Sequence, residues 1–435
     1  MSLSIQSLQS ALEPLVGGGV HPAEVVDAIG GVQPQVVVEP GNEEEVSAVL
    51  AFANKEGLRV LIRGGGTQLG SGSPPTGGDI LLSTTRLNAI VEHVPHDLVV
   101  TAQAGLPLAT LQATLQQSKQ WLALDPNLPP EATIGGIVAT NATGPRRLRY
   151  GGVRDQIIGI RVVLADGTIA KGGGKVVKNV AGYDLPKLFT GALGTLGVIV
   201  SATFRLYPMP LASRTVHITA SSISALCELA VRIIGSTLVP TIVDVLGDTA
   251  DTNTYTLAVR FEMGQEAVEA QTATLLAMVA EMQSSIIQAT QQLEGDAETH
   301  FWSHTTSTHE VVDATHATLS LKASLLPTEV AHWLNAIEQV CQQQQLHATW
   351  HAHAGHGLIF VQLSGDDTTL PSAVQTLRQE ALTQQGSLVV TNAPTRLAQH
   401  IDMWGPVPSF AVMRNLKARF DPNHTLNPGR FVGGL

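Results

Sequence analysis

The stretch from Leu58 to Gly72, LRVLIRGGGTQLGSG, constrains the fold of this chain more than any other. An apolar run leads directly into three consecutive glycines, Gly64, Gly65 and Gly66. Glycine tolerates positive φ and lets successive backbone N–H groups point together at an anion. The stretch therefore favours a strand that ends in a phosphate-binding loop, although a wide surface turn has the same composition.

The residues that follow the loop disfavour two common phosphate-binding motifs. A Rossmann dinucleotide site needs G-x-G-x-x-G with a helix starting at once, whereas glycines, serines and prolines fill the chain from Gly70 to Gly78. A Walker loop needs a closing GK[ST], which this stretch lacks. A nicotinamide-dependent dehydrogenase with a Rossmann fold is therefore disfavoured.

Composition narrows the class of protein further. The 435 residues suggest two or three domains, and 44% hydrophobic with 14% charged residues is typical of a globular protein. A net charge of -11 argues against a general nucleic-acid binder and against adhesion to anionic membranes. Cys227 and Cys341 lie far apart, which fits a reducing compartment and excludes an iron–sulfur cluster held by this chain alone.

The N-terminal third of the sequence predicts a β-α-β unit that delivers the glycine loop. Val36–Val38 reads as a buried strand, and Asn42 with Glu45 has the spacing of a helix capping box. Gly57 ends that helix, and 59–62 is the next strand. The first 16 residues show no signal-peptide pattern, and no apolar run reaches the length of a membrane span, so we expect a soluble cytoplasmic protein.

Two further regions follow along the chain. Residues 80–208 read mostly as strands and turns, with a hairpin at Asp166-Gly167 and a long strand near 198–206. After Pro208 and Pro210 helices and strands alternate, which suggests an α+β domain. Its predicted helices are 222–234, 266–291 and 327–344, and its predicted strands are 255–262, 318–324 and 358–363. A basic helix over 412–420 stops at Asp421-Pro422.

Five motifs in a fixed order carry a family resemblance. They are RGGGT at 63–67, ATIGG at 132–136, the segment 141–144, GALGTLGVI at 191–199 and LNPGRF at 426–431. This series resembles the FAD-binding fold of the vanillyl-alcohol oxidase and para-cresol methylhydroxylase (PCMH) superfamily, within its D-lactate dehydrogenase and glycolate oxidase branch. The resemblance implies an α+β fold: a PCMH-type FAD-binding domain of two α/β subdomains, an α+β cap domain, and a C-terminal segment that returns to the FAD domain.

The resemblance also implies boundaries and a cofactor site. We expect an N-terminal helical segment at 1–30, the FAD domain at 31–208 with subdomains of about 31–95 and 96–208, the cap at 209–395 and the returning segment at 396–435. Carried over by position, the FAD-binding residues are Arg63, Gly64, Gly65, Gly66, Thr67, Gln68, Leu69, Pro126, Thr133, Ile134, Gly135, Gly136, Asn141, Gly144, Gly197, Val198 and Ile199. Since no His or Cys lies between Leu61 and Gly78, we expect non-covalent FAD.

The cap departs from the family at its metal motif. Catalytic relatives carry a motif like H-x-G-D-G-N-L-H, in which two histidines and a later Glu hold a divalent metal. Here the first histidine is His353, while His356, Leu358 and Phe360 replace the acid, the amide and the second histidine. The segment 390–394 also lacks the Glu, so the resemblance implies no metal of that kind.

Some cap side chains remain as candidates. His351 and His353 alternate on one strand face near His356, which leaves open either ordinary strand histidines or an improvised metal site. The catalytic residue is unknown, and the candidates are His353, His356 and Lys322. Trp302 and Lys322 are expected to face the flavin. Four further histidines, His300, His304, His309 and His316, are too scattered for a ligand set and are expected to be exposed.

An intact flavin site beside an altered metal motif resembles the accessory FAD-binding E subunit of bacterial glycolate oxidase. That resemblance implies a complex with a catalytic flavin subunit and an iron–sulfur subunit, peripheral to the inner membrane at most. The complex would oxidise glycolate, with D-lactate as a second substrate, to the 2-oxoacid. The alternatives are a self-sufficient FAD oxidoreductase acting on another hydroxyacid or alcohol, and a scaffold that has lost its flavin.

Overall fold

The computed structural model describes residues 4–175, 182–282, 286–305 and 317–435, and the chain divides into two compact units. Unit 1 comprises residues 1–143, 151–209 and 406–435. Unit 2 comprises residues 144–150 and 210–405. The short segment 144–150 thus groups with the cap residues, although it lies within the range expected for the FAD domain.

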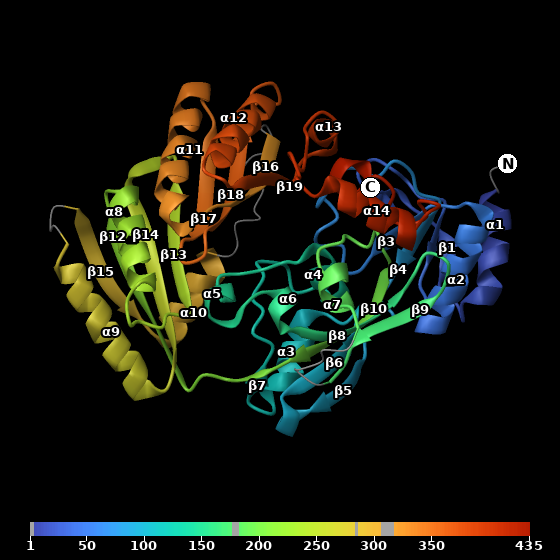
Figure 1. Ribbon diagram of the computed structural model, residues 1–435, viewed down its shortest axis with the longest axis horizontal. Coiled ribbons are helices and arrows are strands. Elements are labelled where there is room, and N and C mark those ends of the chain that lie inside the picture. Colours follow the sequence, from blue (N-terminus) through green and yellow to red (C-terminus); the bar gives the residue numbers. More distant parts are fainter. Residues whose placement is uncertain (1–3, 176–181, 283–285, 306–316) are drawn as a thin grey trace. The chain divides into compact units, whose positions relative to one another are not determined.

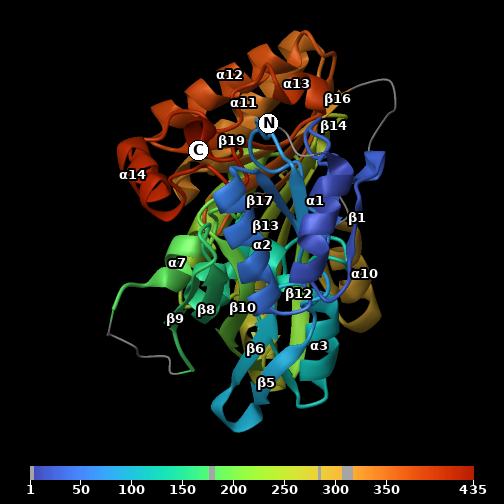
Figure 2. The same cartoon turned by 90° about the vertical axis from the view of Figure 1, so that its right-hand side faces the viewer.

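A four-stranded sheet with two helices on one face forms the first part of unit 1. The strand order is β1 (Val20–Pro22), β2 (Val36–Val38), β4 (Ile80–Ser83) and β3 (Val60–Arg63), with β2 and β3 both parallel to β4. Helices α1 (Ile5–Leu12) and α2 (Glu43–Glu56) cover the same face through a shared apolar core (Figure 2). This core also takes in Val163, Val198 and Val200 of the second sheet.

Local sequence explains where α2 begins and ends. The Asn42 side chain accepts a hydrogen bond from the Glu45 amide at 2.8 Å, and the Glu45 carboxylate accepts one from the Gly41 amide at 2.8 Å. Gly57 closes the helix in the left-handed region with φ 67°. The predicted β-α-β unit is confirmed, although Glu45 reaches back to residue 41 and not to the amide of Asn42.

The second part of unit 1 is a five-stranded antiparallel sheet. Its order is β5 (Ile90–Val94), β6 (Val99–Gln103), β10 (Val198–Arg205), β8 (Ile157–Val163) and β9 (Ile169–Gly173), and the predicted hairpin joins β8 to β9. A short pair, β7 (Gln120–Trp121) with β11 (Tyr207–Pro208), lies apart from it. Residues of helices α3 (Leu108–Gln116), α4 (Ile134–Thr140), α6 (Val153–Gln156) and α7 (Leu185–Phe189) complete its core.

The C-terminal helix α14 (Phe410–Phe420) belongs to unit 1 and ends in a buried ion pair. The Lys417 ammonium donates to Asp421 Oδ2 at 2.7 Å and to two carbonyl oxygens, of Thr195 at 2.9 Å and Leu426 at 3.0 Å. Asp421 also accepts from the amides of Thr425 and Leu426. These contacts fix the segment that follows the helix beside β3, where Asn427 N donates to Val60 O at 2.9 Å.

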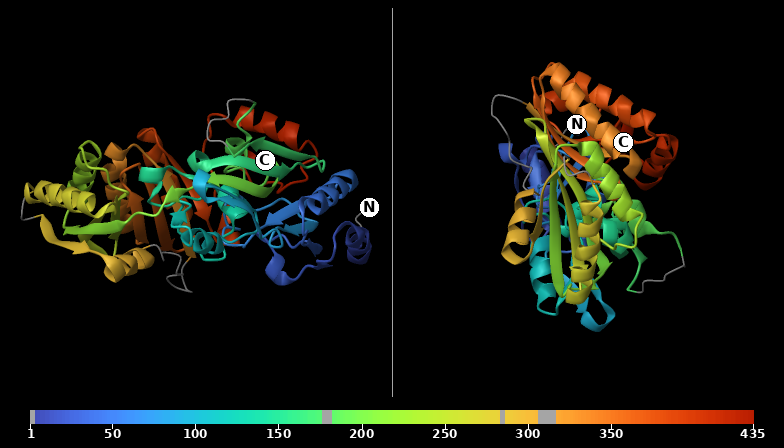
Figure 3. Two further views of the ribbon diagram at one scale, coloured as in Figure 1. Left: turned by 90° about the horizontal axis from the view of Figure 1, so that it is seen from below. Right: turned by 90° about the vertical axis from the view of Figure 1, so that its left-hand side faces the viewer.

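Unit 2 is one eight-stranded antiparallel sheet with helices on both faces. The strand order is β15 (Ile287–Leu293), β12 (Ala212–Ala220), β14 (Asp251–Met263), β13 (Ile242–Asp248), β17 (His347–His353), β18 (Leu358–Gly365), β16 (Ala317–Ser324) and β19 (Ser387–Asn392). The helices α8 (Ile223–Ile234), α9 (Gln265–Ala280), α11 (Val330–Gln344) and α12 (Leu370–Thr383) pack on one face (Figure 1). Helix α10 (Gly295–Thr305) packs on the opposite face through Trp302 (Figure 3). Two short helices, α5 (Arg147–Tyr150) and α13 (Thr395–Ala398), complete the unit.

One predicted helix of unit 2 is wrong in its second half. The helix expected over 266–291 ends at Ala280, and Ile287–Leu293 forms the edge strand β15 paired with β12. Ile286 and Ile287 are β-branched residues, which favour a strand. The backbone of 287–293 pairs with β12 as an antiparallel strand. None of the described helices combines the length and hydropathy needed to cross a bilayer.

Candidate functional site

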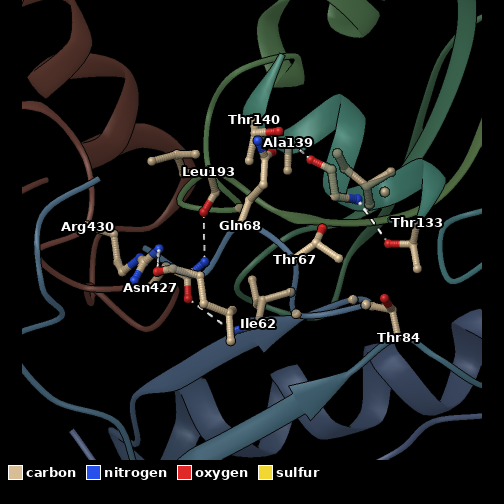
Figure 4. Close-up of a pocket in the computed structure, with 18 of the residues that line it drawn as sticks. Ile62, Thr67, Gln68, Thr84, Thr133, Ala139, Thr140, Leu193, Asn427 and Arg430 are labelled. Carbon is tan, nitrogen blue, oxygen red and sulfur yellow. Dashed lines mark hydrogen bonds between the residues drawn. The ribbon is translucent and has the colours of Figure 1, made fainter. Parts of the chain in front are cut away.

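A pocket in unit 1 is built around the triple-glycine loop (Figure 4). We call it the glycine pocket, and it encloses about 740 Å³ of space including its open mouth. Five stretches of chain line it: the end of β3 with the loop, the residue after β4, α4 with its cap, the turn leading into β10, and the C-terminal segment. The lining residues are Ile62, Gly64, Gly65, Gly66, Thr67, Gln68, Leu69, Thr84, Thr133, Gly135, Gly136, Ala139, Thr140, Leu193, Gly194, Gly197, Ile199, Asn427 and Arg430.

The loop needs glycine because other backbone lies against it. A Cβ at Gly65 would stand 2.0 Å from the Glu131 carbonyl oxygen, and Gly66 has φ 76°, in the left-handed region. Within the described chain, the amides from Gly64 to Thr67 donate no hydrogen bond, and the buried Gln68 Oε1 has no partner. Free amides converging on a pocket suit the oxygens of a diphosphate.

The wall opposite the loop is the first turn of α4. Thr133 caps this helix, its hydroxyl accepting from the Gly136 amide at 3.3 Å. Gly135 N donates to Ala104 O at 2.7 Å, and a Cβ on Gly135 would lie 2.7 Å from the Ala104 Cβ. The Ala-Thr-Ile-Gly-Gly motif therefore lets α4 pack tightly at the end of β6 and present Gly136 to the pocket.

The C-terminal segment supplies the remaining side chains. Asn427 donates from Nδ2 to Leu193 O at 2.7 Å and accepts from the Ile62 amide at 3.0 Å, as Figure 4 shows. The buried Arg430 donates to the carbonyl oxygens of Leu69 and Ser71, at 2.8 and 2.6 Å. Burial lowers the pKa of Arg430 to about 10, which still leaves it charged at neutral pH. Arg430 thus holds the loop's carbonyls away from the pocket and adds a positive charge.

The structure brings eleven of the predicted cofactor residues to the pocket, namely Gly64, Gly65, Gly66, Thr67, Gln68, Leu69, Thr133, Gly135, Gly136, Gly197 and Ile199. The others lie elsewhere in the described chain. Arg63 forms an ion pair with Asp27 at 2.7 Å, Ile134 and Val198 are in apolar cores, and Asn141 caps the end of α4. Pro126 is not among the lining residues, and Gly144 belongs to unit 2.

Eight lining residues were not among the predicted ones: Ile62, Thr84, Ala139, Thr140, Leu193, Gly194, Asn427 and Arg430. The LNPGRF motif already pointed to the last two, because it formed part of the resemblance. No local signal identifies Thr84 or Ala139, since only the packing of α4 and β4 brings them to the loop.

Unit 2 contains a second polar site on the sheet face opposite α8 and α11. Asp244 of β13 lies between two histidines of β17; His351 Nε2 donates to Asp244 Oδ2 at 2.5 Å, and His353 Nδ1 donates to Oδ1 at 3.0 Å. We call these three residues the Asp244 cluster; all are buried, with exposed fractions of 0%, 6% and 3%. Burial raises the pKa of Asp244, but His353 and His351 outweigh it and hold that pKa well below its ordinary value.

Two cations without partners lie near this cluster within unit 2. The side chains of Lys322 and Arg147 form no hydrogen bond or ion pair with any residue in the described parts of the chain. Strand register places Lys322 opposite Phe360, and Phe360 opposite His351, with the Lys322 ammonium 5.8 Å from the Phe360 ring. Burial, and secondarily Arg147, lowers the pKa of Lys322 to about 8.

His356 follows β17 in the turn that leads to β18. Its ring lies 5.3 Å from the His353 ring, and both of its nitrogens are buried without a partner. Burial, and then His353, lowers the pKa of His356 to about 3, so its imidazole is neutral. Gly355 allows this turn to approach α5, because a Cβ there would lie 2.9 Å from the Leu148 side chain.

A buried ion pair fixes α5 in unit 2. Arg146 donates from Nε and Nη2 to the two carboxylate oxygens of Glu262, at 3.0 and 2.8 Å. Burial raises the pKa of Glu262, but Arg146 outweighs this and the net shift is downward. The pair accounts for the grouping of residues 144–150 with the cap, and it sets the position of Arg147.

Of the remaining predicted cap residues, one lies in a core, one lies on the surface, and the side chains of the others lie outside the described residues. Trp302 donates from Nε1 to Thr215 Oγ1 at 2.9 Å and packs in a small core under α10. His300 is exposed. His309, His316 and the side chain of His304 lie outside the described residues.

Comparison with known families matches both units. Residues 34–173 match the "FAD binding domain" family, and residues 209–387 with 402–431 match the C-terminal domain of "FAD linked oxidases". Together these matches cover most of unit 2 and the larger part of unit 1.

Curated relatives align either over most of the chain or over less than half of it. Glycolate oxidase subunit GlcD of Bacillus subtilis is 28% identical over 428 residues, covering 91% of this chain and 88% of the relative. D-2-hydroxyglutarate dehydrogenase of Xanthomonas citri is 26% identical, covering 91% and 89%. Glycolate oxidase subunit GlcE of Escherichia coli is 38% identical over 172 residues, covering 40% and 49%.

Solved structures share the fold. An alkyldihydroxyacetonephosphate synthase superposes with a TM-score of 0.71 at 18% identity, covering 92% of this chain and 78% of that one. A 4-ethylphenol oxidase from Gulosibacter chungangensis gives a TM-score of 0.71 at 16% identity, covering 92% and 89%.

Proposed function

Because this chain belongs to the FAD-linked oxidases of PCMH type and is an FAD-dependent oxidoreductase acting on CH–OH donors, we propose that it is the FAD-binding subunit of a glycolate oxidase-type complex. The proposed substrate is glycolate, with D-lactate second, and the product is the 2-oxoacid. The proposed partners are a catalytic flavin subunit and an iron–sulfur subunit that takes the electrons.

One observation carries this proposal: the glycine pocket offers free backbone amides, while the cap has Phe360 where the motif of catalytic relatives carries its second metal-binding histidine. A chain that keeps the flavin pocket but has an altered metal motif can hold flavin, but it lacks part of the metal-ligand set through which catalytic relatives bind a hydroxyacid. Similarity to a GlcD subunit over most of the chain, and to a GlcE subunit over a shorter stretch, supports membership of such a complex.

The glycine pocket fits FAD on the contacts that the chain offers. The free amides from Gly64 to Thr67 would hold the diphosphate, Gln68 has an unused buried acceptor, and Arg430 stabilises the loop behind them. When bound, FAD supplies hydride acceptance and one-electron transfer. With no His or Cys between Leu61 and Gly78, we expect these residues to hold it without a covalent bond.

The cysteines support an external electron acceptor. Cys227 and Cys341 are both free and buried, and burial raises the pKa of each thiol to about 12. Buried thiols of this kind are poor metal ligands and poor nucleophiles. An iron–sulfur cluster needs about four cysteine thiolates, so it would belong to a partner.

Reconstitution tests the proposal. The full chain is co-purified with its partners, flavin and iron are quantified, and glycolate oxidation is measured with each subunit omitted in turn. We expect activity to be lost when this chain is left out and restored when the FAD-loaded chain is added back. Full activity from the partners alone would overturn the proposal.

A second candidate is a self-sufficient FAD oxidoreductase acting on another hydroxyacid, and the unpartnered Lys322 and Arg147 favour it. Two partly buried cations whose side chains have no counterion among the described residues suit a substrate carboxylate. Lys322 loses its charge as pH rises through about 8, so the KM of a hydroxyacid is expected to rise about tenfold above that pH. Steady-state kinetics of the isolated chain against a hydroxyacid panel, from pH 6 to 10 in roughly unit steps, measures this; a flat KM excludes the role of Lys322.

A further inference from the structure

The Asp244 cluster differs from the second fully buried aspartate of the described chain, Asp421, in the groups that satisfy its carboxylate. Asp421 in unit 1 receives an ammonium and two backbone amides, which is a purely structural environment. Asp244 receives only two imidazole nitrogens, and within the described residues no amide, lysine or arginine bonds to it. Imidazole nitrogens can exchange a proton for a metal ion, whereas amides and ammonium groups cannot.

The geometry of the cluster also suits one ion. The carboxylate and the two imidazoles each offer a ligand atom, and these atoms lie within 4.8 Å of one another. His351 contacts Asp244 through Nε2, and His353 contacts it through Nδ1. Two rings that lie two residues apart on β17 therefore reach the same carboxylate. Ligand atoms that share a tetrahedral zinc ion are about 3.3 Å apart, so the observed contacts of 2.5 and 3.0 Å need to open only slightly.

His356 provides a second, independent observation. Its ring stands 5.3 Å from that of His353, and both of its nitrogens are buried without a partner. A buried imidazole that makes no hydrogen bond is costly unless something occupies the space beside it.

We propose that Asp244, His351 and His353 bind one divalent transition-metal ion of the zinc class, with His356 beside its open coordination position. This ligand set shares only His353 with the altered family motif, and it departs from the expectation of no metal that the motif gave. A carboxylate and two imidazoles are a common three-ligand set for zinc. The proposal does not depend on the substrate of the complex or on its partners, because it concerns binding of the ion alone.

Metal titration of the tag-free full chain tests the site. The protein is stripped with a chelator, dialysed against Zn²⁺ and analysed by elemental mass spectrometry, with the flavin absorbance recorded as a check on folding. We expect about one zinc per chain, and at least about a hundredfold weaker binding for Asp244→Asn and for His351→Gln. Wild-type chain that retains no zinc, or folded variants that retain it as wild type does, overturns the proposal.

The matched control is the second histidine–aspartate pair on the same two strands. His347 Nε2 lies 2.7 Å from Asp248 Oδ1 near the solvent, and no third ligand joins this pair among the described residues. His347→Gln is expected to leave zinc binding unchanged, and a loss equal to that of His351→Gln would contradict the site. If the cluster variants do not fold, zinc-edge X-ray absorption of the wild type decides: we expect nitrogen and oxygen neighbours at about 2.0–2.1 Å with imidazole scattering. A shell with sulfur or with water oxygens only overturns the assignment.

Discussion

The glycine pocket and the Asp244 cluster build a polar site in opposite ways. The pocket relies on backbone amides, whose directions are set by Gly65 and Gly66 within a short loop. The cluster relies on side chains, and its closest pair, Asp244 and His351, is 107 residues apart in sequence. The spacing of glycines in a short stretch of sequence therefore determines the backbone site. The side-chain site forms only when β13 pairs with β17.

The two sites also differ in what supports them. Behind the pocket, Lys417 and Asp421 anchor the segment that delivers Asn427 and Arg430. Behind the cluster, α5 is held by Arg146 and Glu262, and its Leu148 packs against Gly355. Three substitutions test the support behind the pocket and then each of the two sites.

The largest effect is expected from Lys417→Met. Removing the ammonium leaves the Asp421 carboxylate buried with two amides but no cation, which costs about 3–5 kcal/mol in the free energy of unfolding. Urea unfolding of the flavin-loaded chain measures this. Lys187→Met is the control, because the Lys187–Asp184 pair is exposed and is worth about 1 kcal/mol or less. Equal losses in the two variants would show that the pair does not anchor the segment.

A smaller but more local effect is expected from Gly65→Val. Its side chain would collide with the Glu131 carbonyl, so the loop must move and its amides lose their common direction. We expect flavin affinity to fall by about a hundredfold, equivalent to about 2.7 kcal/mol, as measured by flavin absorbance per chain after dialysis. Gly174→Ala is the control, since that glycine also ends a triple-glycine run but has open space around it. Flavin retention by Gly65→Val would place the diphosphate elsewhere.

The smallest effect on flavin is expected from Asp244→Asn, which should leave the flavin content unchanged. The same variant should lose about 2 kcal/mol of stability, because the amide cannot accept from both imidazoles as the carboxylate does. The Asp244 pKa is lowered on folding, so its contribution is present above about pH 4 and is lost as pH falls below that value. Urea midpoints from pH 3 to 7, in about half-unit steps, should therefore converge for the two proteins at the acid end. Parallel curves would contradict the pairing.

Features that depend on neighbouring residues can be predicted from the sequence, whereas features that depend on long-range strand pairing cannot. The loop at Gly64–Gly66, the capped helix α2 and the hairpin at Gly167 all depend on local residue types, and the structure has each of them. The end of α9 was missed, because edge pairing with β12 and not helix propensity decides residues 287–293.

Side-chain sites were predicted least well. His351 and His353 were recognised as a pair on one strand face, but Asp244 was not, because nothing near it in sequence marks it as their partner. Likewise Arg430 belongs to a recognisable motif, yet its bonds to Leu69 and Ser71 require the C-terminal segment to return to the loop. Such contacts depend on pairing between segments far apart in the chain, and this pairing cannot be inferred from a single sequence.

The most direct test of the account is anaerobic reduction of the flavin. The purified full chain is loaded with FAD and mixed with glycolate, first alone and then with the partner subunits, while the flavin absorbance is followed. We expect the flavin to stay oxidised in the isolated chain and to be reduced when the partners are present. Rapid reduction by glycolate in the isolated chain, or a chain that binds no FAD, would contradict this expectation.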